Sequence, residues 1–222
     1  MYSARKLAIT FSVFCILALV PSFAAAELEV NLYGGVASPE KDKVTVKGYY
    51  GGFSAEASDN VKYKDGAEFG GRLTYWFTDP SINANWFGMA LDVSYFQTEA
   101  KTYGADIWVV PVSGLIMLRY PGRFLQPYVG VGGGFYISHF KQNVDLTAYG
   151  LGNQTFSDTK VNAGFDARAG LQIRLFKGFG IFGEGRYTYF SPEYDDNILG
   201  AEVKVKTDSE VYHALVGIAY HF

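Results

Sequence analysis

Apolar and polar residues alternate with a period of two along most of the chain beyond residue 26. In the segment Phe165–Leu175, phenylalanine, alanine, leucine and isoleucine occupy one set of alternate positions, and charged residues, glutamine and glycine occupy the other. This alternation is typical of a β-strand with one apolar face and one polar face. It predicts eight strands: Glu29–Ala37, Ala67–Phe77, Phe87–Phe96, Trp108–Tyr120, Pro127–Ile137, Phe165–Leu175, Ile181–Tyr189 and Tyr212–Phe222.

The connectors between these strands alternate between long and short. Long connectors are expected at 38–65, 97–106, 141–160 and 191–209, and short ones at 79–85, 121–126 and 176–180. Transmembrane β-barrels have this arrangement because their periplasmic turns are short and their external loops are long. The pattern therefore predicts an all-β fold, an eight-stranded antiparallel up-and-down transmembrane β-barrel.

Arginine and lysine occupy different places along the chain. Beyond residue 26, five of the six arginines lie on the polar face of a predicted strand, whereas all eleven lysines lie in connectors or at strand edges. A planar guanidinium can donate two parallel hydrogen bonds to one carboxylate and therefore suits a narrow interior. We expect an interior polar network of Glu68, Arg72, Asp92, Arg119, Asp166, Arg168, Arg174, Glu184 and Arg186.

A soluble β-sandwich is the alternative explanation of the strand pattern. A sandwich would scatter lysines along its solvated faces, and no predicted strand has a lysine at its centre. In a barrel, a cation on the lipid face would cost roughly 2–4 kcal/mol at the membrane midplane. Aromatic residues near both ends of the predicted strands are typical of the two girdles of such a barrel. The sorting of charge therefore favours the membrane barrel.

The first 26 residues have the features of a secretory signal peptide. Arg5 and Lys6 precede an uncharged run, Leu7–Val20, and three alanines end at Ala26. A membrane anchor is the alternative, but an uncharged run of fourteen residues is short for a bilayer core. We expect a signal peptide at 1–26 and one barrel domain at 27–222. Cys15, the only cysteine, lies within the expected signal peptide, so no disulfide framework is predicted.

The last predicted strand adds a resemblance to a known family. Every second residue back from the C-terminus is apolar or aromatic, which resembles the C-terminal assembly signal of bacterial outer-membrane proteins. The segment Pro127–Tyr136 is similar to a strand common in the small outer-membrane β-barrel superfamily, which includes the OmpA transmembrane domain, OmpX and OmpW. The resemblance covers residues 27–222. The residues of the assembly signal are Tyr212, Ala214, Val216, Ile218, Tyr220 and Phe222.

The resemblance implies an integral protein of the cell outer membrane, exported through the general secretory pathway. Its implied partners are outer-membrane lipid, lipopolysaccharide, the barrel assembly machinery and periplasmic chaperones. The formal net charge of −3 gives no support to a nucleic-acid partner. We expect a monomer.

No catalytic, cofactor or metal site is expected from the sequence. The three histidines, His139, His213 and His221, do not have metal-ligand spacing. Ser138 and His139 adjoin, but the local pattern of outer-membrane lipid A deacylases is missing. The predicted external loops contain one acidic group and one basic group, and a solvated surface is the simpler explanation of both. The acidic group is Glu193, Asp195 and Asp196, and the basic group is Lys41, Lys43, Lys47, Lys62 and Lys64.

Three function hypotheses follow. The first is a closed barrel with a structural or surface-interaction role carried by its external loops. The alternative is passage of a small, apolar solute, as the resemblance to OmpW suggests. The inward-facing Gly130, Gly132 and Gly134 either leave room for large neighbours or line a ligand cavity, and only the cavity would favour passage. The third is a lipid A-modifying enzyme, for which no serine, histidine and acid cluster can be assembled.

Overall fold

The period-two segments form strands that close into a barrel. The computed structural model describes residues 26–40, 42–50, 53–61, 63–79, 84–100, 105–145, 153–176, 178–191, 193–198 and 201–222. Of the signal peptide predicted at 1–26, residues 1–25 therefore lie outside the described residues, and Ala26 begins the first strand. Within this part of the chain, no helix is long and apolar enough to cross a membrane.

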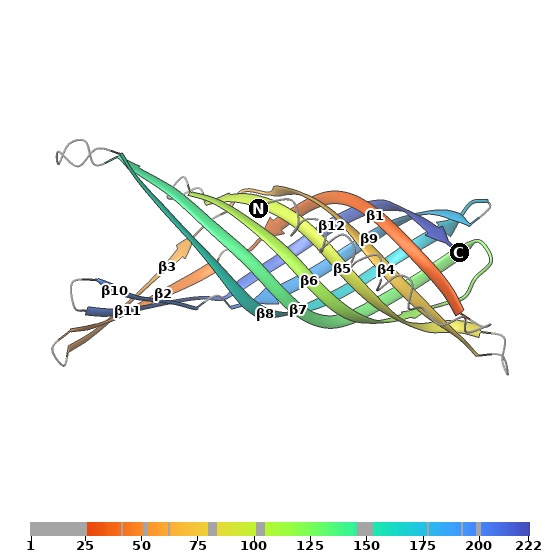
Figure 1. Ribbon diagram of the computed structural model, residues 1–222, viewed down its shortest axis with the longest axis horizontal. Helices are drawn as coiled ribbons and strands as arrows, with labels where there is room; N and C mark the ends of the chain where they lie inside the picture. The colour runs from red at the N-terminus through yellow and green to blue at the C-terminus, as the bar shows by residue number, and fades with distance from the viewer. Residues whose placement is uncertain are drawn as a thin grey trace, which may run out of the picture.

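Eight antiparallel strands make up the barrel, in the order β1-β12-β9-β8-β7-β6-β5-β4, with β4 pairing back to β1 (Figure 1). This confirms the fold class predicted from the sequence. Each strand contains most or all of its predicted segment and is generally longer. The bounds are β1 Ala26–Pro39, β4 Gly66–Asp79, β5 Ala84–Ala100, β6 Ala105–Arg119, β7 Leu125–Asp145, β8 Asn153–Arg174, β9 Phe179–Phe190 and β12 Ser209–His221.

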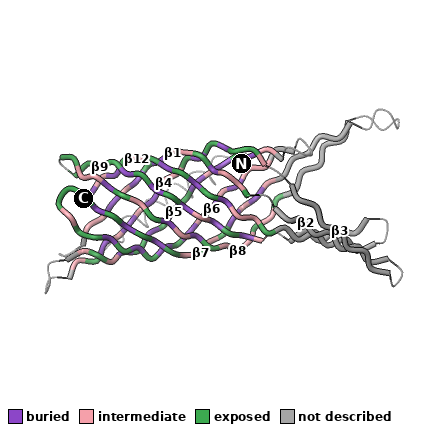
Figure 2. Tube along the Cα trace, turned by 180° about the vertical axis from the view of Figure 1, so that it is seen from behind, coloured by how far each residue is buried: buried purple, intermediate pink, exposed green. Residues whose placement is uncertain are grey.

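Buried and exposed residues alternate along every barrel strand, as Figure 2 shows. The outward faces carry valine, leucine, isoleucine and phenylalanine, which a lipid environment accepts. Aromatic rings form two rows around the outside. The row near the C-terminus includes the stacked pair Phe77–Phe87 and the edge-to-face pair Tyr220–Phe222. The opposite row includes Phe69–Tyr95 and Tyr187–Tyr212.

The two aromatic rows are separated by a constant interval of eight residues, from Phe69 to Phe77 in β4 and from Tyr212 to Tyr220 in β12. Eight residues span about 26 Å along a strand. With a strand tilt of roughly 40°, this gives about 20 Å along the membrane normal. The distance between the rows is thus slightly below the roughly 25 Å height of the apolar band that aromatic girdles enclose in transmembrane barrels.

Four further strands form a second sheet at the end of the barrel opposite the C-terminus (Figure 1), in the order β10-β11-β2-β3. The expectation that residues 38–65 and 191–209 are loops is therefore wrong. The expectation that every lysine lies outside strand centres is also wrong, because Lys47 lies in β2 and Lys204 lies in β11. The bounds are β2 Asp42–Tyr50, β3 Phe53–Val61, β10 Glu193–Ile198 and β11 Ala201–Thr207.

This second sheet continues the barrel hairpins in register. From the pair Ala37–Gly66 of β1 and β4, the pair Asp42–Val61 of β2 and β3 lies five residues further along both strands. From the pair Ser209–Phe190, the pair Lys206–Glu193 lies three residues further along both strands. Each half of the external sheet is thus the extended tip of a barrel hairpin.

The contact between the two tips does shift register. From Pro39–Val211 to Val44–Thr207, the first strand advances five residues and the last strand four. A shift of one residue exchanges the faces of a strand. Here it puts Lys47 opposite Lys204 and Val46 opposite Val205.

The other predicted long connectors also differ from the structure. β5 continues to Ala100 and β6 begins at Ala105, so the connector predicted at 97–106 is largely strand. β7 continues to Asp145 and β8 begins at Asn153, and the hairpin that they form projects at the same end as the second sheet (Figure 1). The rule that periplasmic turns are short identifies this end as external.

The inward glycines of β7 serve two purposes. A Cβ at Gly130 would meet the sulfur of Met117 and the side chain of Arg168, so this glycine leaves room for large neighbours in the lumen. A Cβ at Gly132 would instead collide with the carbonyl oxygen of Gly114 on β6, and one at Gly134 with that of Val112. These two positions have no side chain because the neighbouring strand occupies the space, which permits a strongly coiled wall.

Candidate functional site

The barrel interior is the candidate functional site, because polar side chains from all eight barrel strands gather there. The alternation that exposes valine and leucine to lipid turns charged residues inward. Of the nine residues predicted for an interior polar network, eight are buried and Arg174 lies half-buried at the periplasmic rim. The buried eight are Glu68, Arg72, Asp92, Arg119, Asp166, Arg168, Glu184 and Arg186.

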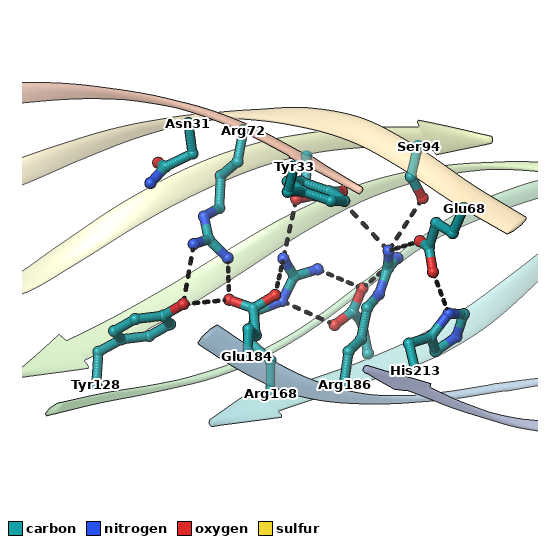
Figure 3. Close-up of polar contacts among 12 residues, drawn as sticks. Asn31, Tyr33, Glu68, Arg72, Ser94, Tyr128, Arg168, Glu184, Arg186 and His213 are labelled. Carbon is teal, nitrogen blue, oxygen red and sulfur yellow. Dashed lines mark hydrogen bonds and ion pairs between the residues drawn. The ribbon is translucent and has the colours of Figure 1, made fainter. Parts of the chain in front are cut away.

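Arg168 of β8 is the centre of the network (Figure 3). Its Nη1 donates to Asp92 Oδ2 at 2.9 Å and lies 3.3 Å from Glu184 Oε1. Its Nε and Nη2 donate to the two oxygens of Asp166 at 3.1 and 2.8 Å. The guanidinium thus joins β5, β8 and β9 across the lumen, and none of these side chains is exposed to solvent.

Arg186 of β9 extends the network toward the external end. Its Nη1 donates to Glu68 Oε1 and Ser94 Oγ, both at 3.0 Å, and its Nη2 lies 2.7 Å from Asp166 Oδ2. The other oxygen of Glu68 pairs with Nδ1 of His213. Sequence reasoning missed His213, although its alternation with outward-facing Tyr212 and Ala214 places it inside.

Arg72 of β4 extends the network toward the periplasmic end. Its Nη1 donates to Glu184 Oε2 at 2.5 Å, and Tyr128 Oη donates to the same oxygen at 2.7 Å. The guanidinium carbon lies 5.4 Å from the ring centroids of both Tyr128 and Phe182. This distance lies within cation–π range. Tyr33 Oη donates to Asp92 Oδ1 at 2.8 Å, which ties β1 to the same network.

A second polar layer lies at the periplasmic end. Arg119 donates to both oxygens of Glu27, at 3.2 and 2.6 Å, and its guanidinium lies 4.1 Å from the ring centroid of Trp76. Trp76 Nε1 in turn donates to Glu29 Oε2 at 2.8 Å. His221 Nδ1 and Arg174 both pair with Glu27. Glu27 precedes the predicted first strand, whereas Glu29 and His221 lie within predicted strands but were not included in the predicted network.

Glu27, Glu29 and His221 bring potential metal-ligand atoms within 4.8 Å of one another. Arg119 and Arg174 already neutralise Glu27, and Arg119 Nη1 lies 3.5 Å from Glu29 Oε2. Two guanidinium groups at these carboxylates oppose a further cation, because like charges repel at such distances. The group therefore acts as a salt-bridge layer rather than as a cation site.

One group of side chains has the order of a hydrolase triad. Thr188 Oγ1 lies 3.0 Å from His213 Nε2, and His213 Nδ1 pairs with Glu68. A hydroxyl, an imidazole and a carboxylate in this order can activate a nucleophile. Here all three side chains are buried within the lumen, and the Phe96 ring packs edge-on against His213 at 5.5 Å. An acyl chain in the membrane therefore has no access to the hydroxyl.

The neighbouring pair Ser138 and His139 does not form a site. Ser138 is buried on the inward face of β7, whereas His139 faces outward and stacks on Trp108 at 4.7 Å. Adjacent residues of a strand point to opposite faces, so these two side chains cannot converge. The predicted acidic group at Glu193, Asp195 and Asp196 lies in β10, and of the predicted lysine group Lys43 and Lys47 lie in β2; the side chains of these residues lie outside the described part.

The pairing of β5 with β6 has a local break. β5 and β6 pair at Val93–Val112 and again at Phe96–Val109 in the same register, but the positions between them do not pair. Ser94 would face Pro111, which has no backbone N–H to donate. On the lumen side of this position, Ser94 Oγ accepts a hydrogen bond from Arg186, so the charged network lies directly behind the break.

The six residues of the predicted assembly signal share the outward face of β12. Tyr212, Val216, Ile218 and Phe222 are exposed large hydrophobic residues, Ala214 is exposed and Tyr220 is half-buried. The backbone N–H of Phe222 donates to the carbonyl oxygen of Leu28 at 2.8 Å. The end of the chain is thus fixed at the seam between β12 and β1.

Comparisons with known proteins agree with this architecture. The family model described as "Outer membrane protein beta-barrel domain" matches residues 15–222. OprG from Pseudomonas aeruginosa has 18% sequence identity and a TM-score of 0.56, with 87% of this chain and 95% of that chain covered. The outer membrane protein AlkL has 14% identity and a TM-score of 0.53, with 89% and 90% covered. No curated protein matches the chain.

Proposed function

The chain belongs to the outer membrane protein beta-barrel domain family and is an integral outer-membrane protein, and from that premise we propose that it is a closed barrel acting through its external sheet. The barrel anchors the protein, and its lumen conducts no solute. The tips formed by β2, β3, β10 and β11 supply the surface that contacts the envelope or other cells. We include lipopolysaccharide among the partners of this surface, and the barrel assembly machinery and periplasmic chaperones among those of the folding chain.

The observation that carries this proposal is the position of Arg168. Its guanidinium holds carboxylates from β5, β8 and β9 at 2.8–3.3 Å with no solvent exposure. An eight-stranded barrel has an interior just wide enough for side chains to fill. A solute moving along the axis would have to separate these ion pairs, and breaking one buried pair costs about 3–5 kcal/mol.

Single-channel recording of the refolded protein in a planar bilayer tests the closed lumen. We expect no conductance steps from protein whose folding a heat-shift gel has verified. A doubly substituted variant, Arg168→Ala with Arg186→Ala, removes the two central guanidinium groups and serves as the control for detection. Reproducible steps from the unmodified protein at low voltage would contradict the proposal.

The role of the external sheet is tested by trimming it. In this variant, short turns replace residues 41–62 and 192–208, while the eight barrel strands remain. Cells lacking the protein are complemented with the full or the trimmed form, and entry of a large antibiotic measures envelope integrity. We expect only the full form to restore the barrier; equal restoration by the trimmed form counts against the external sheet.

Passage of a small apolar solute through the wall is the second candidate, and the break beside Pro111 is the observation that favours it. Tyr95 and Val110 lie opposite each other on the lipid-facing side of this break. A disulfide between Tyr95→Cys and Val110→Cys would hold the two strands together. Val93→Cys with Val112→Cys is the matched control, because this neighbouring pair is already joined in the ladder.

Uptake of an apolar dye into proteoliposomes distinguishes the two candidates. Wall passage requires uptake by the unmodified protein, its loss with the first disulfide and its return on reduction. The control disulfide should leave uptake unchanged. The second candidate is excluded if the unmodified protein shows no uptake, or if neither disulfide changes the uptake.

We also propose that the protein has no catalytic role. The buried position of Thr188, His213 and Glu68 and the opposed faces of Ser138 and His139 support this. Mass spectra of lipid A from cells with and without the protein provide the test. Identical spectra are expected, and a mass shift equal to one acyl chain would overturn this part of the proposal.

A further inference from the structure

Three buried polar atoms without a hydrogen-bond partner lie together on the inner wall formed by β1 and β4. They are Asn31 Oδ1, Arg72 Nε and Thr74 Oγ1, and each has no partner among the described residues. Asn31 pairs directly with Arg72 across the two strands, and Thr74 follows on the same inward face of β4. Figure 3 shows Asn31 beside Arg72. Of the ten buried side-chain atoms without a partner in the described part of the chain, these three are on neighbouring inward positions of two paired strands, and such a group calls for an explanation.

The chemistry of the three atoms limits what can occupy this site. Arg72 Nε can only donate a hydrogen bond, and Asn31 Oδ1 can only accept one. The amide orientation of Asn31 is fixed because its Nδ2 donates to Glu29 Oε1 at 2.8 Å. A cation would face the guanidinium of Arg72, and an anion would face the amide oxygen of Asn31. A small neutral molecule that both accepts and donates hydrogen bonds satisfies all three.

We propose that a single ordered water occupies this site. It accepts from Arg72 Nε, donates to Asn31 Oδ1 and makes its third hydrogen bond with Thr74 Oγ1. Three hydrogen bonds are the usual number for a buried water in a globular protein. The site lies between the network around Arg168 and the periplasmic layer around Glu27, which no direct side-chain hydrogen bond among the described residues connects.

The water has a structural consequence for the lumen. Asn31 already belongs to the periplasmic layer through Glu29, and Arg72 belongs to the central network through Glu184. The water therefore joins the two layers into one hydrogen-bonded column, from His221 at the periplasmic rim to Thr188 in the external half. The lumen is sealed by this continuous column rather than by two separate layers.

Replacement of Thr74 by valine tests the site through the direction of its effect. If the hydroxyl has no partner, Thr74→Val removes a buried unsatisfied group and raises the urea midpoint of unfolding. If the hydroxyl binds the proposed water, the same change lowers the midpoint. Thr98→Val is the matched control, because Thr98 Oγ1 donates to the carbonyl oxygen of Lys64 at 2.6 Å and its loss must lower the midpoint. A midpoint for Thr74→Val that rises or stays unchanged overturns the proposal.

A second measurement needs no variant. In the refolded, isotope-labelled protein, the Nε–H of Arg72 should show a nuclear Overhauser effect to a long-lived water. The Nε–H of Arg168 is the internal control, because it donates to Asp166 Oδ1 at 3.1 Å and has no place for water. Equal signals at the two arginines, or none at Arg72, would overturn the proposal even if Thr74→Val failed to fold.

Discussion

Arg168 and Asp166 are two positions apart on β8, and the guanidinium of the first donates to both carboxylate oxygens of the second, at 3.1 and 2.8 Å. Such a bidentate pair between alternate residues of one strand is possible because both side chains face the lumen. Asp92 and Glu184 approach the same guanidinium from other strands. One arginine therefore contacts three buried carboxylates, whose charge it balances together with Arg72 and Arg186.

Replacing this arginine should destabilise the barrel strongly. Arg168→Met removes the guanidinium that Asp92, Asp166 and Glu184 share. We therefore expect a loss of about 3–5 kcal/mol in the free energy of unfolding. Arg168→Lys keeps the charge but loses the bidentate geometry, so its loss should be smaller. Urea unfolding in lipid bilayers, followed by tryptophan fluorescence, measures both. Arg123→Met, in an exposed turn, is the control and should change stability by less than about 0.5 kcal/mol.

An arginine on the lipid face should have an effect that depends on depth. Leu171 of β8 is exposed outward and pairs with Gly183, which lies midway between the aromatic positions Phe179 and Tyr187 of β9. Leu171→Arg should cost about 2–4 kcal/mol and block folding, while Leu175→Arg, four residues nearer the rim, should cost about 0–1 kcal/mol. Lys204→Arg, in the external sheet, should fold normally. Equal folding yields for the three variants would show that the face assignment is wrong.

Deletion of Phe222 should impair membrane assembly. The ring is exposed, packs edge-on against Tyr220 at 4.6 Å, and ends the alternating outward face of β12. The amount of heat-modifiable protein in isolated outer membranes is the measurement. Phe176→Ala, an exposed aromatic in a periplasmic turn, is the control. Normal levels of the folded deletion variant would count against an assembly role for this residue.

Two glycines should respond in opposite ways to alanine. A Cβ at Gly132 would collide with the carbonyl oxygen of Gly114, whereas a Cβ at Gly183 would meet nothing within 4 Å. Gly132→Ala should therefore lower the urea midpoint, and Gly183→Ala should leave it unchanged or raise it because alanine loses less backbone entropy on folding. If both variants unfold at the same midpoint, the close approach of β6 and β7 is not important for stability.

The barrel and the inward side of each strand could be predicted from the sequence because both depend on a local period of two. Phe165–Leu175 shows this well, since its alternation gives both the lipid face and the positions of Asp166 and Arg168. The pairing of particular charges could not be predicted. Arg72 and Glu184 are distant in sequence, and nothing local says that they meet across a lumen.

The external sheet was missed for a related reason. Residues 42–50 and 201–207 alternate lysine and valine as barrel strands alternate their own residues, but they lie in stretches that the connector pattern assigns to loops. Each also pairs with a local neighbour, but their union into one sheet depends on the pairing of β2 with β11, which joins opposite ends of the chain. Glu27 was missed because strand ends are defined by pairing partners rather than by periodicity. His221 lay within a predicted strand, and its pairing with Glu27 is a contact between the two ends of the chain that no local pattern shows.

The pairing of β2 with β11 has a consequence for the order of assembly. β1 and β12 are the first and last strands of the barrel, and their pairing is the step that closes it. β2 and β11 continue these strands outward and pair over the same seam. The local hairpins β2–β3 and β10–β11 can consequently join into one external sheet only when the first and last strands of the barrel come together. A surface that exists only on the finished barrel would keep unfinished chains from displaying it.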